Sequence, residues 1–179
     1  MSVYFGGSRH LGNLPIVGQV VAHVLQSQSV HVGCQFGADH QVIMSVPWSR
    51  AGSLSVFAVA PNQASAPAPV LQAVTMGASV TYSAGGTSAP IPARYLLRSI
   101  AAFQGCTAAV FFQPGYGSLA VARECVRSGV PVFAFNPTAG RKSIPPASIP
   151  SVSGQWVRSI FFGQFLCWRW SYPAQLSLF

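Results

Sequence analysis

Acidic side chains are almost absent from this sequence of 179 residues. Asp39 and Glu124 are the two acids, against ten lysines and arginines, which gives a formal net charge of +8. Chemistry that needs two carboxylates, or a metal site built on Asp and Glu, has only these two residues to draw on. The positive charge favours an anionic partner such as a nucleotide or a nucleic acid. A basic protein without such a partner is the alternative interpretation, because the arginines are spread along the chain.

The sequence also lacks paired cysteines, long apolar runs and internal repeats. Its four cysteines are Cys34, Cys106, Cys125 and Cys167. They show no C-x-x-C spacing, so neither a zinc site nor a disulfide framework is indicated. No apolar run approaches the roughly 18 residues of a membrane span, and the N-terminus has no signal-peptide pattern. We therefore expect a cytoplasmic protein with reduced thiols, no bound metal, no required cofactor and no membrane contact.

A strand, a glycine-rich turn, a helix and a second strand are predicted between Thr107 and Phe135. Residues 108–112 and 130–135 are short apolar runs of strand length, rich in residues that favour strands. The turn between them breaks the first run, and Ser118 is the predicted N-cap of the helix. Two apolar strands around one helix indicate a βαβ unit of a parallel sheet. Its glycines lie where such a fold binds ligands, at the carboxyl end of a strand.

Strands and helices alternate through the rest of the first 135 residues. Strands are predicted over residues 3–5, 30–32, 54–60 and 78–82, and helices over 14–26, 38–48 and 93–104, with a short helix ending at Met76. Three of the strands are followed by glycine turns, which a parallel sheet would bring to one edge. The expected fold class is therefore α/β, a Rossmann-like, doubly wound and mainly parallel sheet.

The chain changes character after Phe135. Residues 136–154 are rich in proline and serine and are predicted to be irregular. Residues 155–172 are dense in aromatic side chains, which we expect to pack on the domain because so much exposed aromatic surface would aggregate. We therefore divide the chain into a Rossmann-like domain (1–135), an aromatic-rich extension (136–172) and a C-terminal peptide (173–179).

The three glycine turns together resemble those of the SLOG superfamily. This group of Rossmann-like proteins includes LOG/lysine-decarboxylase-like enzymes and the DNA-processing protein DprA/Smf. The resemblance covers residues 3–135 and rests on Gly6-Gly7-Ser8-Arg9, on the segment from Gly33 to Asp39, and on Pro114-Gly115-Tyr116-Gly117-Ser118. It implies that the chain binds a nucleotide or single-stranded nucleic acid. It also allows a homodimer, since the relatives are often dimers.

The resemblance implies that phosphate contacts come from the turns and from two arginines. Arg94 and Arg98 lie four residues apart on the helix where relatives often carry an arginine-containing pair. Arg9 is the expected phosphate contact of the first turn, a solvated loop arginine being the alternative. Asp39 either orients the second turn or contacts a ribose or base. The predicted nucleotide-binding residues are Gly6, Gly7, Ser8, Arg9, Gly33, Gly37, Asp39, Arg94, Arg98, Gly115, Gly117 and Ser118.

One departure from the superfamily pattern disfavours catalysis. LOG-type phosphoribohydrolases carry a glutamate three residues after the threonine of their G-T-x-x-E motif. In this chain Ser118 takes the threonine position and Val121 the glutamate position. Glu124 lies one helical turn further on and is the sole candidate for a LOG-like nucleoside-monophosphate phosphoribohydrolase. A non-catalytic binding module fits these residues better, and a sensor of a nucleotide signal is a further alternative.

The last five residues match a different pattern. Gln175-Leu176-Ser177-Leu178-Phe179 has the Q-L-x-L-F form by which bacterial polymerases and repair factors bind the DNA polymerase III sliding clamp. The match implies that Gln175 hydrogen-bonds at the edge of a pocket while Leu176, Leu178 and Phe179 enter hydrophobic clefts. A chain terminus can adopt the extended form that this requires. The alternative is that these side chains pack on the domain as a terminal strand.

Overall fold

The computed structural model describes residues 1–136 and 143–172. Within them, eight strands form one sheet in the order β4-β3-β2-β1-β5-β6-β8-β7. These strands are β1 (Ser2–Gly7), β2 (Ser29–Val32), β3 (Leu54–Phe57), β4 (Ser79–Thr81), β5 (Ala108–Phe112), β6 (Val132–Phe135), β7 (Gln155–Phe161) and β8 (Phe165–Ser171). Strands β1 to β6 are parallel to one another, and β8 runs antiparallel to both β6 and β7.

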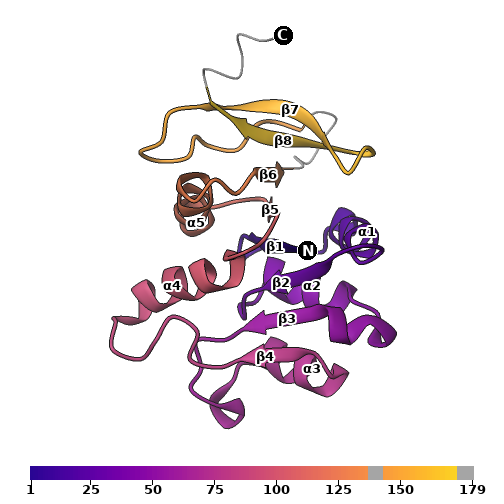
Figure 1. The fold of residues 1–179 in the computed structure, drawn as a ribbon, viewed down its shortest axis with the longest axis vertical. Coiled ribbons are helices and arrows are strands. Elements are labelled where there is room, and N and C mark those ends of the chain that lie inside the picture. Colours follow the sequence, from indigo (N-terminus) through magenta and orange to yellow (C-terminus); the bar gives the residue numbers. More distant parts are fainter. Residues whose placement is uncertain (137–142, 173–179) are drawn as a thin grey trace.

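Helices cover both faces of the sheet (Figure 1). The helices are α1 (Pro15–Val24), α2 (Ala38–Ser45), α3 (Ala68–Met76), α4 (Ile91–Phe103) and α5 (Tyr116–Arg127), with short 3-10 helices at Trp48–Ser53 and Gln63–Ser65. Successive strand side chains point to opposite faces. Phe5 and Phe112 therefore join the core with α1, α2 and α3, whereas Tyr4 and Phe111 join the core with α4 and α5.

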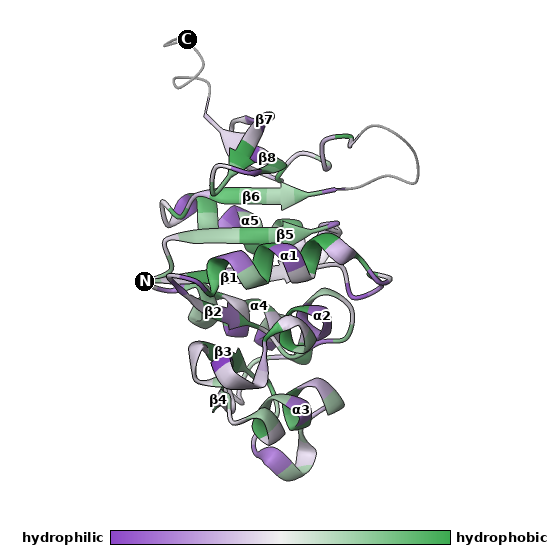
Figure 2. Ribbon diagram, turned by 90° about the vertical axis from the view of Figure 1, so that its right-hand side faces the viewer, coloured by the Kyte–Doolittle hydropathy of each residue, from purple (hydrophilic) through white to green (hydrophobic). Residues whose placement is uncertain are grey.

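Three phenylalanine rings connect the central strands on the first of these faces. Phe112 of β5 stacks on Phe5 of β1 and on Phe135 of β6, with ring centroids 6.0 Å and 5.5 Å apart. All three side chains are buried. Figure 2 shows the hydrophobic character that runs along β5 and β6 at this level of the sheet. The stack fixes the spacing of β1 and β5, the two strands that lead into the first and third glycine turns.

The structure confirms the predicted fold class, a doubly wound and mainly parallel α/β sheet. The helix predicted over 38–48 is wrong at its end, because α2 stops at Ser45. Pro47 disfavours the helical conformation of the residue before it, and Val46 is extended with φ −82° and ψ 122°. The strand predicted over 54–60 likewise ends at Phe57.

Residues 155–172 hold a β-hairpin that the sequence analysis did not identify as strands. β8 pairs with β6 through Phe133 and Arg169, so the hairpin extends the sheet beyond the parallel strands. Phe161 is buried in the core with α1, and Trp170 is buried in the core with α5. The predicted clamp-binding peptide, residues 175–179, lies outside the described residues.

Cysteine chemistry in the described part of the chain is that of buried free thiols. All four cysteines are buried and unpaired. Burial raises the pKa of each thiol, to about 11 for Cys167, so the reactive thiolate is scarce at neutral pH. The described residues contain no group of three metal-ligating side chains. None of the helices in residues 1–136 and 143–172 has the length and apolar character that crossing a bilayer requires.

The phenylalanine stack predicts a large loss of stability when its middle ring is removed. We expect Phe112→Ala to lower the free energy of unfolding by about 3–5 kcal/mol, because the ring is fully buried and leaves a cavity. Leu166→Ala is the matched control, since the Leu166 side chain is 80% exposed. It should change the free energy by less than about 0.5 kcal/mol. Urea unfolding measures both, and equal effects would contradict the assigned core.

Candidate nucleotide-binding crevice

The sheet order creates a crevice between β1 and β5. From β1 the chain builds outward through β2, β3 and β4, and then crosses to β5 on the other side of β1. Doubly wound sheets bind ligands at such a switch point, beyond the carboxyl ends of the strands. Gly6 and Gly7 of the first glycine turn are the last two residues of β1, and the third turn follows β5, so both turns border this crevice.

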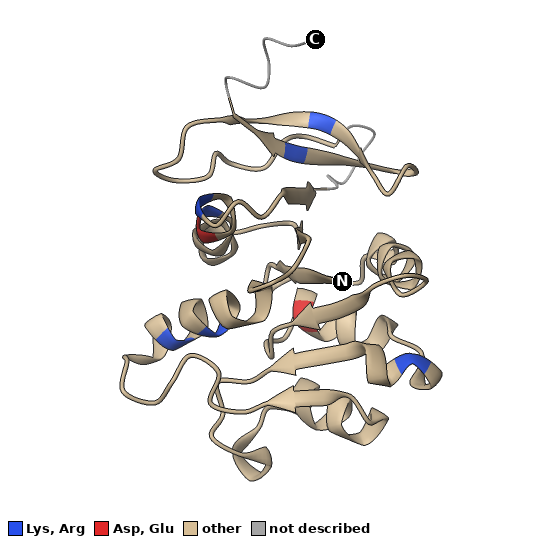
Figure 3. Ribbon diagram, viewed as in Figure 1, with Lys and Arg blue, Asp and Glu red and all other residues tan. Residues whose placement is uncertain are grey.

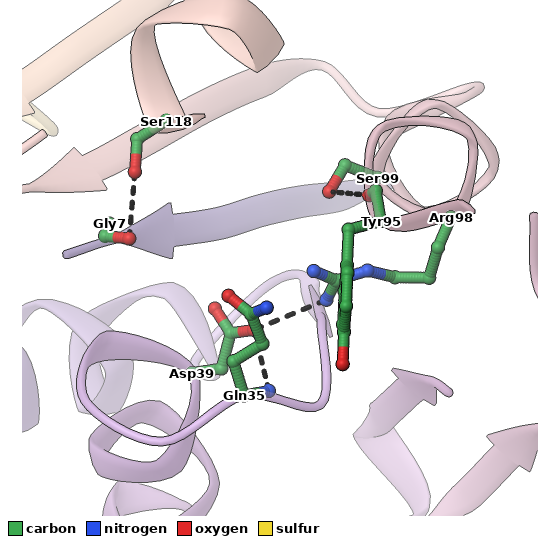
Figure 4. A network of polar contacts seen from close by, with 7 residues as sticks. All are labelled: Gly7, Gln35, Asp39, Tyr95, Arg98, Ser99 and Ser118. Carbon is green, nitrogen blue, oxygen red and sulfur yellow. Dashed lines mark hydrogen bonds and ion pairs between the residues drawn. The ribbon is translucent and has the colours of Figure 1, made fainter. Parts of the chain in front are cut away.

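Hydrogen bonds hold the three turns together. In the first turn, the Ser8 N–H donates to the carbonyl of Phe112 at the end of β5, and the Ser8 carbonyl accepts from the Ala38 N–H, each over 3.0 Å. The Ser118 hydroxyl donates to the Gly7 carbonyl over 2.7 Å (Figure 4). The first turn is thus bonded to the second and to the third. The convergence expected of a parallel sheet is present as direct contacts.

A pocket of about 470 Å³ opens where the turns meet. Its lining includes Gly6, Gly7, Ser8 and Arg9 of the first turn, Gln35 and Asp39 of the second, Gly115, Gly117 and Ser118 of the third, and Arg98 of α4. These ten lining residues come from four separate segments of the chain. The predicted residues that the structure places outside this lining are Gly33, Gly37 and Arg94.

A buried ion pair crosses the inner end of the pocket. The Arg98 Nη1 lies 3.2 Å from the Asp39 Oδ2, and the two side chains are 5% and 8% exposed. The same carboxylate oxygen accepts the Gln35 N–H over 3.1 Å, so Asp39 orients the second turn as well. Burial, the largest single influence, lowers the pKa of the Arg98 guanidinium, but the Asp39 carboxylate, together with Tyr4 and Cys34, raises this pKa above its ordinary value. Arg98 is therefore a permanent positive charge.

The Arg98 guanidinium keeps hydrogen-bonding capacity beyond its ion pair. Its Nε is buried without a partner among residues 1–136 and 143–172. Figure 4 shows the guanidinium extending from α4 toward the second turn, with one terminal nitrogen directed at Asp39. The guanidinium also lies against the Tyr95 ring, 5.7 Å from its centroid. An acceptor entering the pocket would meet donors that the protein leaves available.

Two glycines of the second turn are required by the protein itself. A Cβ on Gly33 would overlap the Arg98 Nη1 and the Asp39 Oδ2, so only glycine lets the ion pair form there. Gly37 has φ +80°, and a Cβ on it would press on the backbone of Ser8 and Arg9. These glycines shape the wall of the pocket without lining it.

The glycines of the third turn have no such requirement. A Cβ built on Gly115 or Gly117 meets nothing within 4 Å, and neither residue has a positive φ. The first amides of every helix lack partners inside the helix. In α5 the N-cap is Gly115, which has no side chain to accept from them. The prediction that Ser118 is the N-cap is wrong, because Ser118 lies inside the first turn of α5. Its hydroxyl donates to the Gly7 carbonyl of β1.

The remaining charged residues lie on several elements, among them α4, α5, β7 and β8 (Figure 3). Arg9 is exposed, lines the pocket and forms no ion pair with the described residues. Arg94 instead donates to the carbonyls of Thr87 and Ala89, in the loop before α4. Glu124 pairs with Arg123 and Arg127 on α5 and does not line the pocket.

Sequence reasoning missed several side chains that the fold brings into the lining. They are Tyr4, His10, Gln35, Pro92, Tyr95, Leu96, Ser99, Phe111, Tyr116, Ala120 and Val121. Tyr95 lies three residues before Arg98 and four before Ser99 on α4, a spacing that could have placed Tyr95 on the same face as each of them. Val121 occupies the position of the LOG glutamate and puts an apolar side chain in the wall.

The fold is similar to that of DNA processing protein A from Helicobacter pylori, whose structure addresses the single-stranded DNA binding mode of that protein. The likeness has a TM-score of 0.55 at 15% sequence identity, over 80% of this chain and 68% of that chain. At this identity it establishes the fold alone. No family model matches the sequence, and no curated protein matches it.

The contrast between the second and third turns predicts that a glycine-to-alanine substitution costs much more stability in the second turn than in the third. We expect Gly33→Ala to destabilise the protein by about 3–5 kcal/mol, because the methyl group displaces a buried ion pair. Gly115→Ala should lower the free energy of unfolding by no more than about 1 kcal/mol, the cost of alanine at an N-cap, since its methyl group faces open space. Thermal and urea unfolding of the two variants test this. A stable Gly33→Ala protein would contradict the close approach of Arg98.

Proposed function

We propose that this chain is a SLOG-like, non-catalytic domain that binds single-stranded DNA through the pocket at the switch point. The observation that carries the proposal is the Arg98 guanidinium, buried at the inner end of the pocket with donors left over from its ion pair. A phosphate oxygen satisfies such donors, and a charge-assisted hydrogen bond of this kind is among the stronger ones.

Three further features of the pocket suit a phosphate group. Arg9 and Arg98 bring two positive charges to the lining and Asp39 one negative charge, which leaves a positive excess. The N-terminus of α5 adds its amides and the positive end of its dipole. The open sides of Gly115 and Gly117 permit a close approach of a ligand to the backbone. The arginines come from the first turn and from α4, the amides and the two glycines come from the start of α5, and all of them border one pocket.

The residues around the third turn support binding over hydrolysis. A LOG-like phosphoribohydrolase would need Glu124 in the pocket, but this carboxylate is engaged by two arginines on the surface of α5. The lining holds Val121 at the corresponding place. The remaining acid, Asp39, is committed to Arg98 and to the Gln35 amide. No carboxylate is left in the lining to act as a general acid or base.

A polymer is favoured over a free nucleotide by the charge of the whole chain and by the structural likeness. The net charge of +8 exceeds what one phosphate group would use and suits a polyanion. The protein with the similar fold is one whose single-stranded DNA binding mode has been described.

Loss of Arg9 predicts weaker binding with a smaller salt dependence. We expect Arg9→Ala to weaken binding of a labelled oligothymidylate by at least about 1.5 kcal/mol. The slope of the logarithm of affinity against the logarithm of salt concentration should fall by about one, because one phosphate contact is lost. Fluorescence anisotropy at several salt concentrations measures both quantities.

Arg158→Ala is the matched control for this measurement. It removes the same charge from an exposed position on β7, outside the pocket lining, and should leave the affinity almost unchanged. Wild-type protein that binds no oligonucleotide would refute the proposed function. A thermal shift with a mononucleotide but not with the oligonucleotide would favour a nucleotide sensor, and release of free base would favour the hydrolase.

The C-terminal peptide supports a finer proposal about where the protein acts. We infer that Gln175-Leu176-Ser177-Leu178-Phe179 recruits the domain to a bacterial DNA polymerase III sliding clamp in the cytoplasm. The support is the sequence match. Burial of its three apolar side chains would contribute about 1.5–3 kcal/mol each. Less the cost of ordering the peptide, such anchors give affinity on the order of micromolar.

Truncation tests the recruitment separately from DNA binding. A protein that ends at Tyr172 should lose clamp binding, measured by surface plasmon resonance, while full-length protein binds on the order of micromolar. Oligothymidylate binding should be the same for both proteins, since the pocket is formed by residues before 122. Equal clamp binding by the two proteins would end the recruitment proposal and leave the DNA-binding proposal intact.

A further inference from the structure

We propose that Tyr116 is the base-stacking residue of the pocket and that it makes the site selective for nucleotides with an accessible, unpaired base. This inference deepens the proposed function and depends on it. It concerns a side chain that is not among the nucleotide-binding residues implied by the superfamily resemblance. The inference draws on the exposure of the ring, its place in the pocket and the absence of any structural role.

Tyr116 is unusual among the aromatic residues of the protein. Its side chain is 87% exposed, the highest value for any aromatic residue in the described ranges. It forms no hydrogen bond and no ring contact with the residues that the structure describes. The aromatic rings of β1, β5 and β6, in contrast, are packed against one another. Folding therefore gives no reason for an aromatic side chain at this position.

The position of Tyr116 is also unfavourable for a residue with only a structural role. It is the first residue of α5, between Gly115 and Gly117, and a tyrosine has only moderate helix propensity. Exposed aromatic surface also carries a cost in solubility. A contact made only in the complex accounts for both features. Stacking on a base is the contact that an exposed ring beside a phosphate pocket can provide.

The geometry of the turn places the ring next to the phosphate site. Tyr116 lines the same pocket as Arg9 and Arg98. Its neighbours on both sides are the glycines whose open faces admit a ligand to the backbone. A phosphate held by the amides at the start of α5 would therefore lie beside the residue that carries the ring. A base in a duplex has its faces covered by its neighbours, so only an unpaired and unstacked base can use it.

Stacking tolerates every base, because each base has a π-face. The pocket would therefore not select a particular sequence. It would bind strands whose bases are missing or paired less tightly. The expected substrate class is single-stranded nucleic acid with flexible, unstacked bases. Phe36 of the second turn is 57% exposed and lies outside the pocket lining, its ring edge-on to His40 at 5.9 Å. It is therefore not assigned the same role.

The test compares three oligonucleotides with three variants by fluorescence anisotropy. The probes are an oligothymidylate, an abasic oligomer of the same length and phosphate number, and a duplex of that length. Wild-type protein should bind the oligothymidylate about tenfold more tightly than the abasic oligomer. Tyr116→Ala should lose this preference while still binding the abasic oligomer like the wild type. Tyr116→Trp should keep or increase the preference.

Trp48→Ala is the matched control, because Trp48 is 62% exposed and lies outside the pocket. It should bind all three probes like the wild type, and none of the variants should change the thermal unfolding temperature. A Tyr116→Ala protein that retains the full preference for the oligothymidylate would overturn the inference. If wild-type protein binds neither single-stranded probe, the proposed function itself fails, which is a different outcome.

Discussion

The ion pair between Arg98 and Asp39 is the interaction on which the site depends. Asp39 belongs to α2 and Arg98 to α4, and these helices lie on opposite faces of the sheet. The pair therefore joins the two helical layers across the carboxyl edge of the sheet. Burying two charges has a high desolvation cost, which is offset only while both remain in place. The absence of a side chain at Gly33 is what allows them to meet. Moving either helix would break the pair and leave two buried charges without their partner.

The glycines of the three turns look alike in the sequence, but glycine is present at each position for a different physical reason. Gly33 and Gly37 make room for parts of the protein, namely a guanidinium and a neighbouring backbone. Gly115 and Gly117 make room for nothing that the protein contains. The first kind builds a rigid wall, and the second kind leaves the wall accessible. A pocket that is preorganised on one side and open on the other can bind a phosphate with little rearrangement.

The fold class and the meeting of the turns were predictable because they follow from local patterns. Apolar runs of strand length, separated by helices, determine a parallel sheet, and a parallel sheet determines where its turns go. The β7–β8 hairpin was not predictable in the same way. Its strands bury Phe161 on one face and Trp170 on the other, so they show no simple alternation of apolar and polar residues. Gly33 and Arg98 are 65 positions apart, and their contact depends on packing that no local pattern encodes.

The scarcity of acidic residues has a consequence for how the protein responds to its surroundings. Its charge is carried by ten lysines and arginines, opposed by two carboxylates that both lie beside arginines. Side chains of these types keep their charge in water between about pH 7 and pH 9. Alkaline shifts in that range therefore leave the attraction to a polyanion nearly constant. Dissolved salt weakens it steeply, through screening and counterion competition. Above neutral pH, ionic strength is therefore the variable that governs how strongly such a protein binds a nucleic acid.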